Sequence, residues 1–257
     1  MKNSLTNEKQ HAKLSASGSK RWMECPGSVI LEAFLPDETS AYAEEGTKAH
    51  ELAEAKLYDL LKNKNPHNLQ ALMQNCDAEM DIATSKYIEY IIDIIDGLKL
   101  EGHQAYTGIE TTVCFDKWVP GGFGTIDFFA VGGTHLHIVD LKYGKGVPVS
   151  AVENPQPRAY SLGFLQDYEL IYDNIEDVTY HIVQPRINNY SSETLTVEEL
   201  TEWAETVLKV KADKAWAGTR EYNPGGAQCK FCKAKAVCRA RASRILNTIA
   251  RVINPAK

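Results

Sequence analysis

The chain has 257 residues, of which 44% are hydrophobic and 24% charged, a composition typical of globular proteins rather than of long disordered segments. No apolar run approaches the ~18 residues of a membrane span, and the polar start of the chain lacks the apolar stretch of a secretory signal. We therefore expect a soluble, cytosolic protein without a membrane partner. The net charge of −6 excludes a globally basic nucleic-acid-binding protein, so any surface for nucleic acid must be local.

The first hundred residues are predicted to be mainly helical. Residues 1–20 are polar and expected to be loosely structured, and residues 21–36 read as a loop or short helix. A helix is predicted over 44–62, followed by a polar connection over 63–76. Isoleucines and leucines recur at three- and four-residue steps over 78–100, which predicts a long amphipathic helix.

The hydrophobic period then changes to that of strands. Strands are predicted over 106–115, 123–131 and 135–142, with a Gly-Gly turn between the last two. A helix over 154–166 and a fourth strand over 178–184 follow.

The remaining chain is predicted to be helical. Thr196 and Glu199 have the spacing of a capping box, for a helix that runs to about residue 217. A short basic helix is expected from about 235 to 252. This order predicts one α/β domain spanning 1–257, with a core at about 44–217 and a small mixed sheet flanked by helices.

The region between residues 121 and 146 carries a possible metal site. Asp127 lies in the second predicted strand, and Asp140 and Lys142, two residues apart, leave the same face at the end of the third. Two carboxylates on adjacent strands repel each other unless a divalent cation neutralises them, and a nearby lysine can orient or deprotonate a water. Taken alone, the same pattern also fits a solvated surface pair. His135 and His137 have the opposite parity on the strand and are interpreted as structural.

These residues, taken in order, form motifs that resemble the RecB-like branch of the PD-(D/E)xK nuclease superfamily. The motifs are Gly124-x-x-Asp127, Asp140-x-Lys142, Gln156-x-x-x-Tyr160 and an upstream Glu-Glu-Gly-Thr-Lys-Ala-His that ends at His50. The resemblance implies a restriction-endonuclease-like core, with Asp127, Asp140, Lys142, Gln156 and Tyr160 as catalytic residues. It also implies a Mg²⁺ or Mn²⁺ site with His50, Asp127 and Asp140 as ligands. The backbone carbonyl of Leu141 is a further candidate ligand, and Glu110 on the first strand is either a metal-side carboxylate or solvated.

Three of the six cysteines cluster near the end of the chain as Cys229-x2-Cys232-x5-Cys238. Clustered thiolates in a cytosolic chain favour metal binding over disulfides, and a fourth ligand is needed for tetrahedral zinc or for a [4Fe–4S] cluster. Cys25 is the candidate for that fourth ligand, whereas Cys76 and Cys114 are interpreted as ordinary thiols.

A distant N-terminal cysteine with this C-terminal spacing resembles the iron–sulfur members of the same branch, including AddB-type helicase–nucleases and CRISPR-adaptation nucleases. The resemblance implies a [4Fe–4S] cluster on Cys25, Cys229, Cys232 and Cys238 that joins segments 14–36 and 225–252. Spacing alone leaves zinc open. The cluster would be structural, since it would close a loop of about 200 residues.

Basic residues follow the first cysteine of the C-terminal cluster without any intervening Asp or Glu. They are Lys230, Lys233, Lys235, Arg239, Arg241, Arg244 and Arg251. They fit either a solvated basic helix or a strip that binds DNA phosphates; the second interpretation is favoured.

The sequence therefore predicts a metal-dependent deoxyribonuclease. The resemblance implies an exonuclease of phage recombination or replication, in the host cytoplasm, with DNA as substrate. A recombinase, a single-strand-binding protein or a helicase subunit is a candidate partner. Two alternatives stay open: a catalytically silent DNA-end or partner-binding module of the same fold, and a zinc-stabilised nucleic-acid-binding protein.

Overall fold

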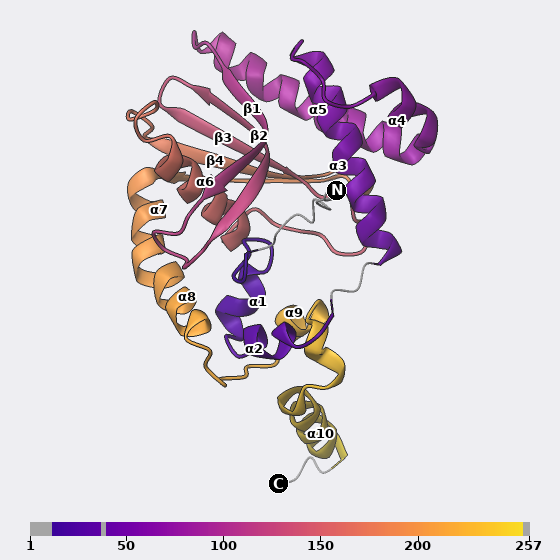
Figure 1. Cartoon of the computed structure of the whole chain (residues 1–257), viewed down its shortest axis with the longest axis vertical. Helices are drawn as coiled ribbons and strands as arrows, with labels where there is room; N and C mark the ends of the chain where they lie inside the picture. Colours follow the sequence, from indigo (N-terminus) through magenta and orange to yellow (C-terminus); the bar gives the residue numbers. More distant parts are fainter. Residues whose placement is uncertain (1–11, 37–39, 254–257) are drawn as a thin grey trace, which may run out of the picture.

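A five-stranded mixed sheet with helices on both faces organises the chain in the computed structural model, which describes residues 12–36 and 40–253 (Figure 1). The strands are β1 (Tyr106–Cys114), β2 (Phe123–Gly132), β3 (His135–Leu141), β4 (Asp177–Gln184) and β5 (Asn189–Thr196). The α-helices are α1 (Ser19–Glu24), α2 (Ser28–Ala33), α3 (Ala41–Leu60), α4 (Leu69–Asn75), α5 (Ala78–Leu100), α6 (Pro155–Asp167), α7 (Val197–Trp203), α8 (Lys209–Trp216), α9 (Gly226–Lys230) and α10 (Arg239–Ile253). Short 3₁₀ or π turns are η1 (Pro185–Ile187), η2 (Ala204–Leu208) and η3 (Lys233–Ala236). None of these helices is both long and apolar enough to cross a lipid bilayer.

The strands lie in the order β1-β2-β3-β4-β5. All neighbours are antiparallel except β3 and β4, which are parallel and are joined through α6. A parallel pair needs such a crossover, because the chain must return to the end of the sheet where the first strand began. The predicted class, a mixed α/β fold with a helix-flanked sheet, is confirmed.

Two apolar layers hold the helices against the sheet. On one face, α3 and α5 pack through Leu57 and Ile91 against Phe128 of β2. On the other, Phe164 of α6 meets Phe129 of β2 edge to face, with ring centroids 4.7 Å apart. Because β2 and β3 are covered on both sides, they form the rigid centre of the fold. These two strands also carry Asp127 and Asp140.

Several predicted elements match the structure closely. The long amphipathic helix is α5, with the predicted bounds, and the four predicted strands are β1 to β4 within one or two residues. Thr196 and Glu199 do form a capping box, since each side chain accepts a hydrogen bond from the other residue's backbone N–H. The helix they begin continues through the π turn η2 into α8.

Three expectations were wrong. The polar connection over 63–76 contains α4, which Asn68 caps through its side chain, and the predictions lacked β5 altogether. In the segment expected to be loosely structured, Leu14 is fully buried and α1 begins at Ser19; residues 1–11 lie outside the described part of the chain. Leu14 is buried because it belongs to the apolar layer on the α6 side of the sheet.

The N-terminal helices and the cysteine-rich segment come together, although about 200 residues separate them in sequence (Figure 1). The Gly27 N–H donates to the Glu221 carbonyl at 2.9 Å, and the Lys233 N–H donates to the Glu32 carboxylate, also at 2.9 Å. Beyond this junction, α10 extends away from the sheet and its helices.

A buried ion pair links α6 to the edge of the sheet. Arg158 Nη2 lies 2.9 Å and 3.0 Å from the two carboxylate oxygens of Glu193 on β5, and its Nε donates to the Tyr180 hydroxyl at 3.0 Å. We expect Arg158→Met to lower the free energy of unfolding by about 3–5 kcal/mol, because it strands a buried carboxylate.

The measurement is urea unfolding of the full chain. Lys99→Met removes a comparable but exposed pair with Asp96 and is expected to cost less than about 1 kcal/mol. Equal losses for the two variants would show that the Arg158–Glu193 pair is not a special support of the fold.

Candidate active site

Three acidic residues lie on neighbouring strands at the point where the sheet divides. The β1–β2 ladder pairs the residues on both sides of Glu110 and Asp127, which places these two opposite each other. The β2–β3 ladder ends at Phe128 and Val139, so Asp127 and Asp140 are the next residues on their strands. The three carboxylates therefore come from adjacent positions of β1, β2 and β3.

Glu110 has a left-handed backbone, with φ of 45°, inside a β-strand. Such a conformation costs a residue with a Cβ about 1–3 kcal/mol and is often found at functional sites. It also reverses the side-chain alternation of β1: Ile109 packs with the layer beneath α5, whereas Val113 packs with the layer beneath α6. The distortion thus redirects β1 at the residue that contributes a carboxylate.

His50 of α3 completes a group of potential metal ligands. Single ligand atoms of His50, Glu110 and Asp127 all lie within 4.8 Å of one another, and His50 Nδ1 is 3.4 Å from Asp127 Oδ1. Burial alone would lower the pKa of His50, but the Asp127 and Asp140 carboxylates outweigh it and raise this pKa to about 9. For Asp127 the directions are opposite. Burial raises the pKa of this carboxyl group, but His50, Lys142 and a backbone N–H together lower it below its usual value.

Asp140 and Lys142 form the second half of the site. Lys142 Nζ lies 2.7 Å from Asp140 Oδ2 and donates to Gln156 Oε1 at 3.1 Å. Gln156 Nε2 in turn donates to Asp140 Oδ1 at 3.1 Å and lies 3.2 Å from the Tyr160 hydroxyl. Burial, with the negative charge of Asp127, raises the pKa of Asp140 against the opposing effects of Lys142 and His50.

The start of α6 positions Gln156 and Tyr160 on one helical face. Asn154 caps this helix by accepting a hydrogen bond from the Gln156 backbone N–H, and Pro155 occupies the first helical position. The Tyr160 ring lies so close to β2 that a Cβ on Gly124 would be 2.5 Å from it. Gly124 is therefore required sterically, which accounts for its place in the first motif.

Leu141 contributes its backbone to the site. Its N–H donates to Asp127 Oδ2 at 2.8 Å and so connects β3 to β2 beyond the end of their ladder. A ligand role for its carbonyl stays a prediction.

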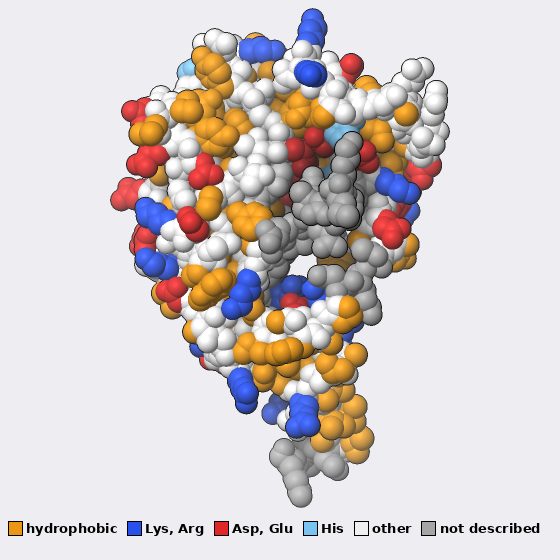
Figure 2. Space-filling view, in the orientation of Figure 1, with side chains coloured by type: hydrophobic (Ala, Val, Ile, Leu, Met, Phe, Trp, Pro, Cys, Tyr) orange, Lys and Arg blue, Asp and Glu red, His pale blue; other side chains and the backbone are white. Residues whose placement is uncertain are grey.

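An open cleft of about 800 Å³ leads to His50, Glu110 and Asp127. Hydroxyl side chains that the sequence had not indicated also line it: Ser15, Ser17, Thr47, Thr112 and Thr125. The three-residue spacing of Thr47 and His50 on α3 is the one sequence signal that could have identified any of them. In Figure 2, acidic and histidine side chains gather in a recess in the upper half of the molecule.

The geometry fits a divalent cation. Asp140 Oδ2 is buried and, among the described residues, accepts no hydrogen bond of good geometry, although Lys142 is close. Carboxylate oxygens with one imidazole nitrogen suit Mg²⁺ or Mn²⁺, which prefer oxygen donors. Such a site, beside a lysine, can polarise a phosphodiester and activate water.

The four cysteines predicted to share a metal line one small cavity: Cys25, Cys229, Cys232 and Cys238. No three of their sulfurs, all within the described chain, lie within 4.8 Å of one another. Burial raises the pKa of Cys25, and burial with the nearby Glu32 raises that of Cys232 to about 11. Cys76 and Cys114 lie elsewhere, with their thiols beside backbone carbonyls of their own neighbourhoods.

The predicted DNA strip lies on the cysteine side of the molecule and not in the cleft. Lys230, Lys235, Arg241 and Arg244 line a groove of about 550 Å³ between α9 and α10. Arg241 and Arg244 donate to the carbonyls of Lys235 and Pro224, which holds part of the strip in place. Of the remaining basic residues, Lys233 begins η3, Arg239 begins α10 and Arg251 lies in the last turn of α10.

Comparison with known proteins shows the family. Residues 11–256 match the family described as "Protein of unknown function (DUF2800)", and the chain belongs to it. Among solved structures, one described as a "Putative exonuclease" from Eubacterium rectale is 13% identical, with a TM-score of 0.47, and the match covers 93% of this chain and 94% of that one. A second, SSO0001, is also 13% identical, with a TM-score of 0.35, and covers 92% and 90%.

The left-handed backbone at Glu110 should affect the free energy of unfolding of variants at this position. We expect Glu110→Gly to be more stable than Glu110→Ala by about 1 kcal/mol, because glycine has no steric cost at positive φ. Urea unfolding of both variants measures the difference.

Thr112, on the same strand with an ordinary backbone, is the matched control. There the order is expected to reverse, with glycine less stable than alanine by about 0.5–1 kcal/mol. If alanine were also the more stable residue at position 110, the strained conformation would be refuted.

Proposed function

We propose that this member of the DUF2800 family is a Mg²⁺- or Mn²⁺-dependent deoxyribonuclease. The observation that carries the proposal is the convergence of His50, Glu110 and Asp127 on one point, with the Asp140–Lys142 pair beside it. Carboxylates held this close in a partly buried site are stabilised by a cation, and the lysine adds a group that can act on water.

The chain's own residues divide the work. His50, Glu110, Asp127 and Asp140 would hold the cation, which supplies charge neutralisation and polarises the scissile phosphate. Lys142 would orient the attacking water and stabilise negative charge on the phosphate. Gln156 would fix the positions of Lys142 and Asp140, because its side-chain amide forms a hydrogen bond with each of them. The carboxylates raise the pKa of His50, which favours its protonated form, so cation binding would compete with that proton.

DNA is the proposed substrate, in line with the RecB-like motifs described above. The cleft of about 800 Å³ is open to solvent and lined by hydroxyl groups, which can donate hydrogen bonds to phosphate oxygens. The basic strip would attract the same backbone from outside the cleft, so that binding and cleavage use different parts of the chain. Action at DNA ends, in phage recombination or replication, completes the proposal.

We further propose that the cysteine cavity holds a [4Fe–4S] cluster. Four thiolates around one cavity are the usual ligand set of such a cluster. The resemblance to iron–sulfur members of the RecB-like branch favours it over a single zinc ion. The cluster would join α1–α2 to α9–α10, close to the hydrogen bond that the Gly27 N–H donates to the Glu221 carbonyl.

Catalysis is expected to depend on the central pair. Lys142→Met should reduce metal-dependent cleavage of end-labelled DNA by at least ~10²-fold, because a positioned proton-transfer group typically contributes that much. Asp140→Asn should lose both cleavage and Mn²⁺ binding by calorimetry. The matched control is Lys145→Met, which alters an exposed lysine paired with Glu79 and should leave cleavage unchanged.

Near-normal turnover in Lys142→Met would contradict the assigned role of this lysine. Absence of any metal-dependent cleavage in the unaltered protein, with normal DNA binding, would favour a catalytically silent module.

The basic strip is tested through salt. Neutralising Arg239, Arg241 and Arg244 together should weaken DNA binding and lower the slope of log affinity against log salt by about 0.7–0.9 for each lost phosphate contact. Fluorescence anisotropy at several salt concentrations measures this slope.

A control triple variant neutralises the exposed Lys62, Lys64 and Lys99, which lie on or after the helices α3 and α5. It should leave the slope unchanged. Equal slopes for both triple variants would mean that the strip is only a solvated basic surface.

The cysteine cavity is tested by composition. Cys25→Ala should lose iron, acid-labile sulfide and visible absorbance together, although it lies about 200 residues from the other ligands. Cys76→Ala, the control, should retain all three. Full iron content in Cys25→Ala would contradict the four-ligand assignment, and stoichiometric zinc without sulfide in the unaltered protein would contradict the cluster.

A further inference from the structure

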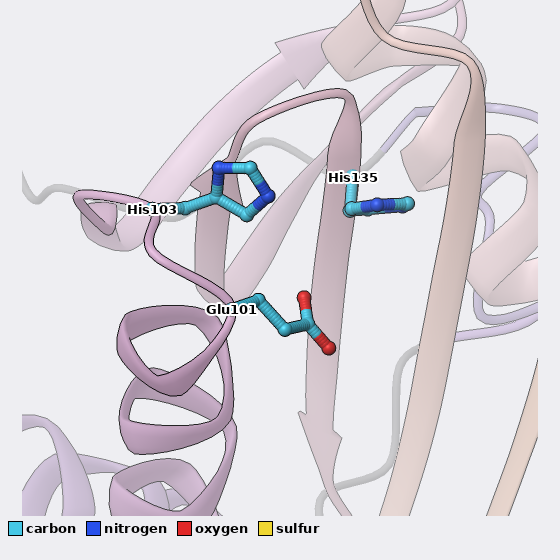
Figure 3. A group of neighbouring side chains, drawn as sticks. All are labelled: Glu101, His103 and His135. Carbon is cyan, nitrogen blue, oxygen red and sulfur yellow. The ribbon is translucent and has the colours of Figure 1, made fainter.

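A second convergence of metal-binding side chains lies away from the candidate active site, where α5 ends and β3 begins. Single ligand atoms of Glu101, His103 and His135 all lie within 4.8 Å of one another. Figure 3 shows Glu101 and His103 extending from the end of α5 towards His135 on the strand. His135 is five residues before Asp140, which separates the two groups by about 17 Å along β3.

The C-terminus of α5 places Glu101 and His103 on the same side. Gly102 has a φ of 88° and ends the helix, with its N–H donating to the Lys99 carbonyl at 3.0 Å. The His103 N–H donates to the Leu98 carbonyl at 2.9 Å. This pair of bonds is a Schellman motif, which fixes the residues immediately before and after the glycine.

The turn between β2 and β3 fixes the ring of His103. Gly133 in this turn has a φ of 60°, and a Cβ there would lie 2.6 Å from the ring. The imidazole therefore rests against the glycine backbone. The His103 and His135 ring centroids are 6.2 Å apart, on the two sides of the space that Glu101 approaches.

His135 is oriented in the way that metal-binding histidines are. Its Nδ1 lies 2.8 Å from Asp177 Oδ2, on the adjacent position of β4. An ionised carboxylate can only accept, so Nδ1 carries the proton and Nε2 keeps its lone pair for a ligand. A carboxylate behind a histidine in this manner recurs in zinc sites, where it fixes the tautomer and strengthens the ligand.

We propose that Glu101, His103 and His135 bind one transition-metal ion of the Zn²⁺ class, with Asp177 as the residue that positions His135. Two imidazole nitrogens and one carboxylate oxygen suit Zn²⁺ and disfavour Mg²⁺ and Ca²⁺, which prefer oxygen donors throughout. Ligand atoms in a tetrahedral zinc site lie about 3.3 Å apart. The exposed Glu101 side chain can rotate towards the ion, and the two imidazole nitrogens, now within 4.8 Å of each other, would have to approach by up to about 1.5 Å.

The ion would join the end of α5 to the β2–β3 turn and leave one coordination position for water. Its binding favours the folded chain, because these three ligands meet only after α5 has docked on the sheet. This proposal differs from the sequence-based interpretation of His135 as a structural residue. It does not depend on the proposed nuclease activity.

The test is calorimetric titration of ZnCl₂ into the full chain in an Asp127→Asn, Asp140→Asn background, which disables the candidate active site. Adding Glu101→Gln or His135→Gln should remove one zinc site per chain. Asp177→Asn should keep that site but weaken its affinity about 10–100-fold. Because the cysteines are present in every variant, any zinc they bind cancels in the comparison.

His67→Gln is the matched control, since His67 also lies between two carboxylates, Glu51 and Glu54, but belongs to no three-ligand group in the described chain. It should retain the site. Zinc should also raise the thermal midpoint of the background protein and not that of the Glu101→Gln variant, whose exposed substitution is compatible with folding. Identical stoichiometry and affinity with and without Glu101→Gln and His135→Gln would overturn the proposal, as would equal loss in His67→Gln.

Discussion

Repulsion among three carboxylates is the constraint on which the rest of this structure depends. Glu110, Asp127 and Asp140 occupy adjacent positions on three strands, at the place where the sheet divides. His50 and Lys142 bring two positive charges to the same place, and Asp127 keeps a low pKa because of them, whereas the pKa of Asp140 is raised. The pKa values of Asp127 and Asp140 therefore differ in opposite directions from the usual value of an aspartate. This pattern is typical of sites that bind a cation or perform acid–base chemistry.

The fold supplies the rigidity that this repulsion demands. β2 and β3 are covered on both faces, α3 brings His50 from one side, and α6 brings Gln156 and Tyr160 from the other. The left-handed backbone at Glu110 and the glycine at position 124 both reduce local stability, and both lie at the site. The segment around Cys25 meets the segment from Cys229 to Cys238 at the cysteine cavity, so the proposed cluster would stabilise the same domain from a separate place.

Much of this arrangement could be predicted from the sequence, and the failures have physical causes. Asp140 and Lys142 share a strand face by parity alone, and the spacing of Gln156 and Tyr160 places them on one helical face. β5 was missed because its alternate residues are polar and exposed, which leaves little apolar signal in an edge strand. The left-handed backbone of Glu110 had no signal, since glutamate rarely adopts it. The group of Glu101, His103 and His135 forms only when α5 docks, so local periodicity could not indicate it.

The carboxylates of the divided sheet are proposed to bind one divalent cation. The most direct measurement is anomalous diffraction at the manganese absorption edge from crystals soaked in Mn²⁺. One peak is expected, bonded to Asp140 and to at least one of His50, Glu110 and Asp127, at distances of about 2.0–2.4 Å. A well-diffracting soaked crystal with no peak at these residues, or with manganese bound only at Glu101, His103 and His135, would contradict it.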